Sequence, residues 1–106
     1  MKIPSEIYSH LGPVPVDPVE NLAKNEKAHG VSKFLQRIIQ IEPKQAAEAA
    51  WQTFFHEMTH YMLWDAGLNN VLTDKQTEAV CDAVGTYLAA AQRAGYIKAV
   101  LPHKGK

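Results

Sequence analysis

The segment FFHEMTHYML, residues 54–63, is the stretch of sequence from which the fold can be inferred. It places two histidines and a glutamate inside an otherwise apolar run. Around it, residues 44–66 contain neither glycine nor proline, the two residues that most often interrupt a helix. Pro43 suits the first helical position, Glu42 the positive end of a helix dipole, and Gly67 the position just after the last turn. The sequence therefore predicts one long helix over residues 43–66.

At about 100° per residue, His56 and His60 leave this helix from the same face. The opposite face carries an apolar stripe made of Ala47, Trp51, Phe54, Met58 and Tyr61. Because Leu63 and Trp64 flank the histidine face as well, we expect the helix to be packed on both sides and the histidines to be partly buried. Burying such polar groups without partners costs several kcal/mol. The pattern therefore indicates that these groups have a partner in the folded protein, and a metal ion is one candidate.

Two histidines at positions i and i+4 of a helix can present their nitrogen atoms to a single zinc ion. Glu57 follows His56 directly, where its carboxylate would reach a water held by such an ion without binding the metal itself. This is the pattern H-E-x-x-H. Catalytic zinc usually has three protein ligands, so the rest of the chain has to supply one more.

A second helix, predicted over residues 73–95, supplies a candidate ligand. It begins with TDKQ, which fits a capping box, and ends at a glycine. Glu78 and Asp82 lie four residues apart and therefore share one face of this helix. Glu78 can complete a set of two histidines and one glutamate around zinc, and Asp82 can accept the free imidazole N–H of one histidine.

The same face continues with Gly85 and Ala89, which are small enough to let the two helices approach closely. Residues 67–71 form a short link between the helices, and a short link favours an antiparallel pair.

The first part of the chain differs from the helical part and is predicted to form strands and loops over residues 1–42. Three prolines, at positions 13, 15 and 18, exclude a helix interior and favour short extended pieces. Ile39 and Ile41 would share one face of a strand. With a tail at 96–106 that packs through Tyr96, Ile97, Val100 and Leu101, we expect one α+β domain over residues 1–106.

HEMTH at 56–60 followed by EAVCD at 78–82 resembles the gluzincin zinc metallopeptidases, whose pattern is H-E-x-x-H followed by E-x-x-x-D. The short chain, with strands before the helix, is most similar to the small ImmA/IrrE-type metallopeptidases of phages and mobile elements. The resemblance implies that His56, His60 and Glu78 bind one zinc ion, that Glu57 is the general base, and that Asp82 orients a ligand from outside the ligand set. It also implies a minimal zincin fold, in which an edge strand, QRIIQIE at 36–42, lines the cleft and pairs with a peptide or protein substrate.

The amino-acid composition limits the classes of partner that the protein is expected to bind. Eleven basic residues balance eleven acidic ones, so no net field draws the chain to nucleic acid or to an anionic membrane. Cys81 is the sole cysteine, which excludes an internal disulfide and favours a small buried residue in a reducing compartment. The first ten residues lack the apolar stretch of a signal peptide, and no apolar run approaches the roughly 20 residues of a membrane span, so we expect a cytoplasmic protein.

The residue that would stabilise the transition state stays open in the sequence. The candidates are Tyr61, Tyr87, His29 and His10, of which Tyr87 is disfavoured because it lies opposite Glu78 on its helix. Two functions other than a peptidase also stay open: a zinc-binding regulatory or protein-interaction module without catalysis, and a metal-free helical interaction protein.

Overall fold

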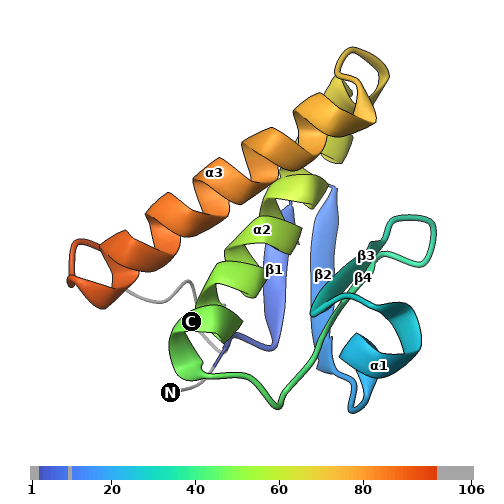
Figure 1. Ribbon diagram of the computed structural model, residues 1–106. Helices are drawn as coiled ribbons and strands as arrows, with labels where there is room; N and C mark the ends of the chain where they lie inside the picture. Colours follow the sequence, from blue (N-terminus) through green and yellow to red (C-terminus); the bar gives the residue numbers. More distant parts are fainter. Residues whose placement is uncertain (1–2, 10, 98–106) are drawn as a thin grey trace.

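The computed structural model describes residues 3–9 and 11–97, which form a four-stranded sheet packed against two long helices (Figure 1). The α+β prediction is therefore confirmed. The elements in chain order are β1 (Glu6–Ser9), β2 (Gly12–Pro18), α1 (Leu22–Glu26), β3 (Gly30–Lys33), β4 (Ile38–Ile41), α2 (Ala47–Asp65), the 3-10 helix η1 (Leu68–Asn70) and α3 (Asp74–Arg93). Helix α2 lies against the sheet, and α3 lies along α2.

The sheet is mixed, with the strand order β1-β2-β4-β3. Two antiparallel pairs, β1 with β2 and β3 with β4, are joined by the parallel pairing of β2 with β4. The prediction that residues 36–42 form the edge strand over the cleft is wrong, because β4 lies inside the sheet. The edge strand that lines the cleft is β3, whose four residues GVSK contain one β-branched residue and give almost no strand signal in the sequence.

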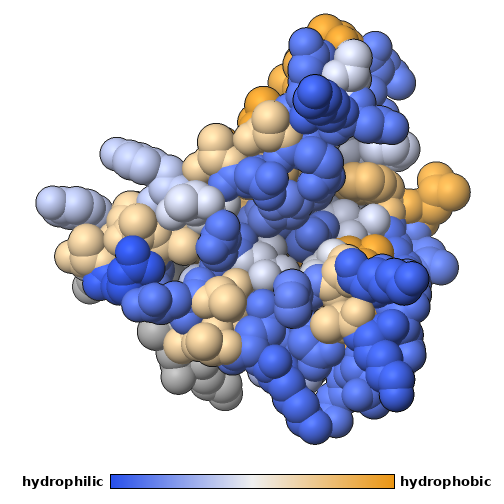
Figure 2. Space-filling view, viewed as in Figure 1, coloured by the Kyte–Doolittle hydropathy of each residue, from blue (hydrophilic) through white to orange (hydrophobic). Residues whose placement is uncertain are grey.

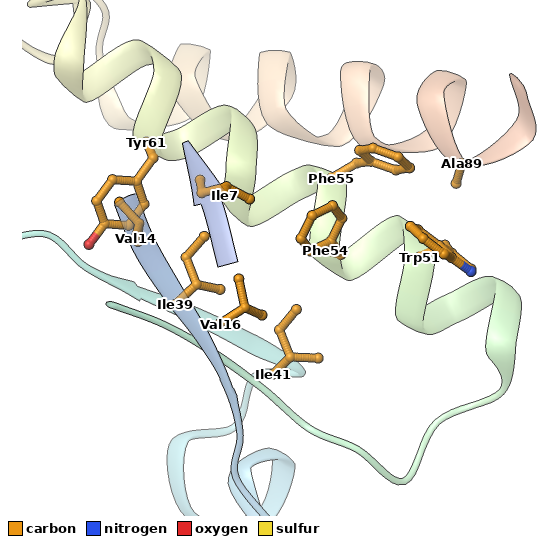
Figure 3. Close-up of a cluster of buried hydrophobic side chains, with 10 residues drawn as sticks. All are labelled: Ile7, Val14, Val16, Ile39, Ile41, Trp51, Phe54, Phe55, Tyr61 and Ala89. Carbon is orange, nitrogen blue, oxygen red and sulfur yellow. The ribbon is translucent and has the colours of Figure 1, made fainter. Parts of the chain in front are cut away.

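The core lies between α2 and the sheet, with a smaller contribution from α3 (Figure 3). Trp51, Phe54 and Tyr61 of the predicted apolar stripe are buried there, and Met58 packs against them. Ala47, in the first turn of α2, is exposed and does not belong to the core. The strands contribute five aliphatic side chains, those of Ile7, Val14, Val16, Ile39 and Ile41.

Helix α2 begins at Ala47 rather than at Pro43, because Glu42 is engaged elsewhere. The Glu42 carboxylate accepts hydrogen bonds from the N–H of Ala23 in α1, at 3.0 Å, and from that of Lys44, at 3.3 Å. The Gln45 side chain donates to the Glu42 carbonyl at 2.7 Å. Glu42 thus stabilises the first turn of α1 and holds the chain before α2 in a turn, instead of starting α2 itself.

The capping box that begins α3 forms as the sequence predicts. The Gln76 N–H donates to Thr73 Oγ1 at 3.1 Å, and the Thr73 N–H donates to Gln76 Oε1 at 2.9 Å. Beyond α3, Gly95 adopts a left-handed φ of 85° that ends the helix.

The tail prediction holds only in part. Ile97 packs against the core, whereas Tyr96 is exposed, and Val100 and Leu101 lie outside the described residues. Within the described part of the chain, no helix combines the length and the hydropathy needed to cross a bilayer.

Candidate metal centre

Helix α2 places the two histidines side by side, facing α3. Their ring centroids lie 4.9 Å apart, and their side chains are 18% and 15% exposed for His56 and His60 respectively. The rings of Phe54 and Tyr61 on the same helix are fully buried in the core, and this packing fixes the rotation of α2 about its axis. The partial burial expected of the histidines is therefore observed.

Helix α3 brings Glu78 to both imidazoles. Glu78 Oε1 lies 3.3 Å from His56 Nε2, and Glu78 Oε2 lies 2.8 Å from His60 Nε2. On the other side of the His56 ring, Asp82 Oδ1 lies 2.9 Å from Nδ1. A hydrogen bond from Nδ1–H to Asp82 would leave Nε2 unprotonated and turned toward His60 and Glu78. The structure thus brings the two predicted α3 residues to the two histidines.

Gly85 explains how closely the two helices approach. A Cβ atom at this position would lie 3.1 Å from the backbone nitrogen of His56 and 3.2 Å from its Cα. These are backbone atoms of a helix, so they cannot move aside singly. A residue without a side chain at position 85 therefore sets the distance at which Glu78 and Asp82 reach the histidines.

Glu57 lies beside this group but belongs to the interior. Its side chain is only 7% exposed, and its Oε2 atom lies 3.9 Å from His56 Nε2. Ser32 of β3 donates a hydrogen bond to the other oxygen, Oε1, at 2.5 Å. Burial raises the pKa of the Glu57 carboxyl, against the lowering effect of the Ser32 hydrogen bond and of the two histidines.

The donor atoms fit a metal ion. His56, Glu57 and His60 each offer a ligand atom within 4.8 Å of the others, and so do His56, Glu78 and Asp82. Donors about 2.0 Å from a tetrahedral ion lie about 3.3 Å from one another, close to the separations between Glu78 and the two Nε2 atoms. His56, Glu57 and His60 of α2, together with Glu78 and Asp82 of α3, therefore form a candidate metal-binding group.

Cys81 adjoins the group without joining it. Its thiol is fully buried, and burial raises its pKa to about 12, so the thiol stays protonated at neutral pH. The expectation of a small buried residue is met.

A cleft of about 790 Å³ opens onto these residues. Its lining includes the histidines and Glu57 of α2, and Gly30, Val31, Ser32 and Phe34 of β3 and the turn that follows it. The face shown in Figure 2 is largely hydrophilic, with hydrophobic surface at the tip of the β3–β4 hairpin, where Leu35 is 95% exposed. Along α2 the lining of the cleft extends from Ala49 to His60, so the candidate metal site lies at its His60 end.

The candidates for transition-state stabilisation separate in the structure. Tyr61 is buried and donates its hydroxyl proton to the Lys33 carbonyl at 2.8 Å. Tyr87 is 75% exposed and does not line the cleft. Among the candidates within the described residues, His29 alone lines it, and His10 lies outside those residues.

Two residues that sequence reasoning missed, Gly30 and Ser32, contact Glu57 from β3. A lone serine in a weak strand carries no signal of its own. Only the alternation of side chains along a strand that packs on α2 would have placed both residues on the Glu57 side.

Comparison with protein-family models, with curated proteins and with solved structures finds no match for this chain. The assignment therefore depends on the residues and their geometry.

Proposed function

We propose that this protein is a zinc-dependent peptidase of the gluzincin type, with one zinc ion held by His56, His60 and Glu78. The observation that carries the proposal is the meeting of two Nε2 atoms with one carboxylate, 3.3 Å and 2.8 Å away, beside a buried glutamate. A structural site has no use for that glutamate, whereas hydrolysis needs a base at this position. The resemblance of HEMTH and EAVCD to the gluzincin pattern supports the same function.

A bound zinc ion would lower the pKa of a water to about 7 and polarise the scissile carbonyl group. Glu57 would take the proton from the attacking water and pass it to the leaving amine. Asp82 would hold His56 in one tautomer through Nδ1.

The substrate would be a peptide or protein segment in extended form, paired with β3. The Glu42 N–H donates to the His29 carbonyl at 2.8 Å, at the start of the antiparallel pairing of β3 with β4. Because hydrogen-bonded pairs alternate along such a ladder, the backbone groups of Gly30 and Ser32 point away from β4, toward the open edge. A substrate strand can hydrogen-bond to them there.

The deciding test replaces Glu57 with glutamine. We expect Glu57→Gln to bind zinc and to fold like the wild type but to cleave a peptide library at least about 100-fold more slowly, because the general base is lost. Glu48→Gln, which changes an exposed glutamate on the same helix, is the matched control and should cleave normally. Equal cleavage by wild type and Glu57→Gln would refute the proposed mechanism.

A zinc-binding interaction module without catalysis is the second candidate, and one observation favours it. The tyrosine side chains considered as transition-state donors, Tyr61 and Tyr87, both lie away from the cleft. The module would bind a protein partner in the cleft without cleaving it. A zinc-loaded wild type that melts at a higher temperature than the metal-free protein, yet cleaves nothing across a broad peptide library, would establish this alternative.

A further inference from the structure

The hydrogen bond between Ser32 and Glu57 joins residues 25 positions apart in the chain. The Ser32 hydroxyl lies 2.5 Å from Glu57 Oε1 and 3.3 Å from the Glu57 backbone carbonyl. A hydroxyl has one proton to donate, and the shorter distance identifies the carboxylate as its main acceptor. Strand β3 is thus attached to α2 at the position of the proposed general base.

This hydrogen bond restricts the orientation of the Glu57 carboxylate. The last torsion of a glutamate side chain has a broad preference, so an unattached carboxylate takes many orientations. With Oε1 held by Ser32, the second oxygen, Oε2, faces His56 Nε2 at 3.9 Å. The oxygen that would accept the proton is therefore the one that the hydrogen bond leaves available.

Gly30 completes the contact from the same strand. A Cβ atom at position 30 would lie 2.6 Å from Thr53 Cγ2, 2.9 Å from Glu57 Cγ and 3.3 Å from Glu57 Oε2. Any side chain at this position would therefore collide with α2 and cover the available oxygen. Its absence lets β3 approach closely enough for the Ser32 hydroxyl to reach the carboxylate.

We propose that Ser32 is a positioning residue for Glu57, holding Oε1 so that Oε2 is presented to the reacting water. The proposal rests on the proposed peptidase function and adds to it a role for the edge strand. The backbone groups of Ser32 point to the open edge where the substrate would pair, while its side chain holds the base. One residue thus connects the binding of the substrate strand to the orientation of the base.

The test compares Ser32→Ala, Ser32→Thr and the wild type, each loaded with zinc, on one cleaved peptide. We expect Ser32→Ala to lower kcat by about 10- to 100-fold, because a base misplaced by about 1 Å loses about that much. KM should change less than twofold, because the backbone groups that pair with the substrate are retained. Ser32→Thr keeps the hydroxyl and should recover most of kcat, and Ser5→Ala, at an exposed serine before β1, is the matched control.

A second measurement needs neither zinc nor activity. In the metal-free protein, Ser32→Ala should lower the urea midpoint of unfolding when Glu57 is present and leave it unchanged in the Glu57→Leu background. If Ser32→Ala fails to fold, Ser32→Cys replaces it, since a thiol of similar size is a weak donor and should also lower kcat.

The outcomes separate the two proposals. A wild type that cleaves, with a kcat for Ser32→Ala within twofold of its own, overturns the role of Ser32 and leaves the peptidase function standing. An equal shift of the urea midpoint in both backgrounds overturns it as well. A zinc-loaded wild type without any cleavage refutes the peptidase function, and the role of Ser32 falls with it.

Discussion

The two helices contribute to one candidate metal site from different surroundings. The histidines and Glu57 of α2 lie in or near the core, whereas the Glu78 and Asp82 side chains of α3 are 57% and 71% exposed. Core packing holds the α2 groups in place with or without an ion. The α3 groups are placed by the contact between the helices and by their pairing with the histidines. The comparison indicates that the α2 groups are organised in advance, whereas a bound metal ion would have to hold the α3 groups.

The largest effect should come from removing the exposed ligand. We expect Glu78→Gln to lower zinc affinity by more than the roughly 10- to 100-fold that changes outside the ligand set cause, because an amide cannot replace a charged ligand. Unfolding of the metal-free protein should hardly change, because Glu78 is exposed. Competition with a chromogenic chelator measures the affinity.

The control for this change is Glu48→Gln, which removes a comparably exposed charge from the other helix. It should leave zinc affinity unchanged. A loss of affinity in the control similar to that in Glu78→Gln would mean that the overall charge, rather than Glu78, attracts the ion.

Gly85→Ala should have an intermediate effect on zinc affinity, because it should move Glu78 and Asp82 of α3 away from the histidines of α2. Alanine gains about 1 kcal/mol of helix propensity over glycine, but its Cβ would meet the backbone at His56 at 3.1 Å, and overpacking costs about 1 to 3 kcal/mol. We expect a net loss of about 1 kcal/mol in the free energy of unfolding and a fall of about tenfold in zinc affinity, a change typical of disturbed support around a metal.

Ala83→Gly, at an exposed position of α3, is the control that separates a change in helix spacing from a change in the free energy of unfolding. It should cost about 1 kcal/mol through helix propensity and leave zinc affinity unchanged. An increase in stability for Gly85→Ala would show that α3 can shift freely and that position 85 does not set the helix distance.

The same contrast explains how much could be predicted from the sequence. The long helices and the residues that meet between them follow from a period of 3.6, from the glycines at their ends and from a capping box, all of which are local signals. Strand β3 and its contact with Glu57 depend on pairing with β4 and on packing against α2. Neither the pairing nor the packing can be recognised from four residues with a single β-branched side chain. Glu42 misled the prediction for the same reason, since its partner Ala23 is distant in the sequence.

The smallest effect should be a change in acid stability, at a buried carboxylate on the sheet side. The hydrogen bond from the Ala23 N–H lowers the pKa of Glu42 below its ordinary value of about 4.5, and the Lys44 N–H adds to the effect. A group whose pKa is lower in the folded state stabilises the fold above its unfolded pKa and loses this contribution as the pH falls through its folded pKa. Glu42→Gln should therefore lower the urea midpoint at pH 7 and flatten its decrease below about pH 4.5. Glu20→Gln, at an exposed glutamate, should keep the wild-type pH dependence, because its charge faces solvent in both states. A wild-type pH dependence in Glu42→Gln would show that the Glu42 carboxylate does not help to hold the buried α2 groups in place. The difference between the α2 groups and the α3 groups would then depend on the apolar core alone.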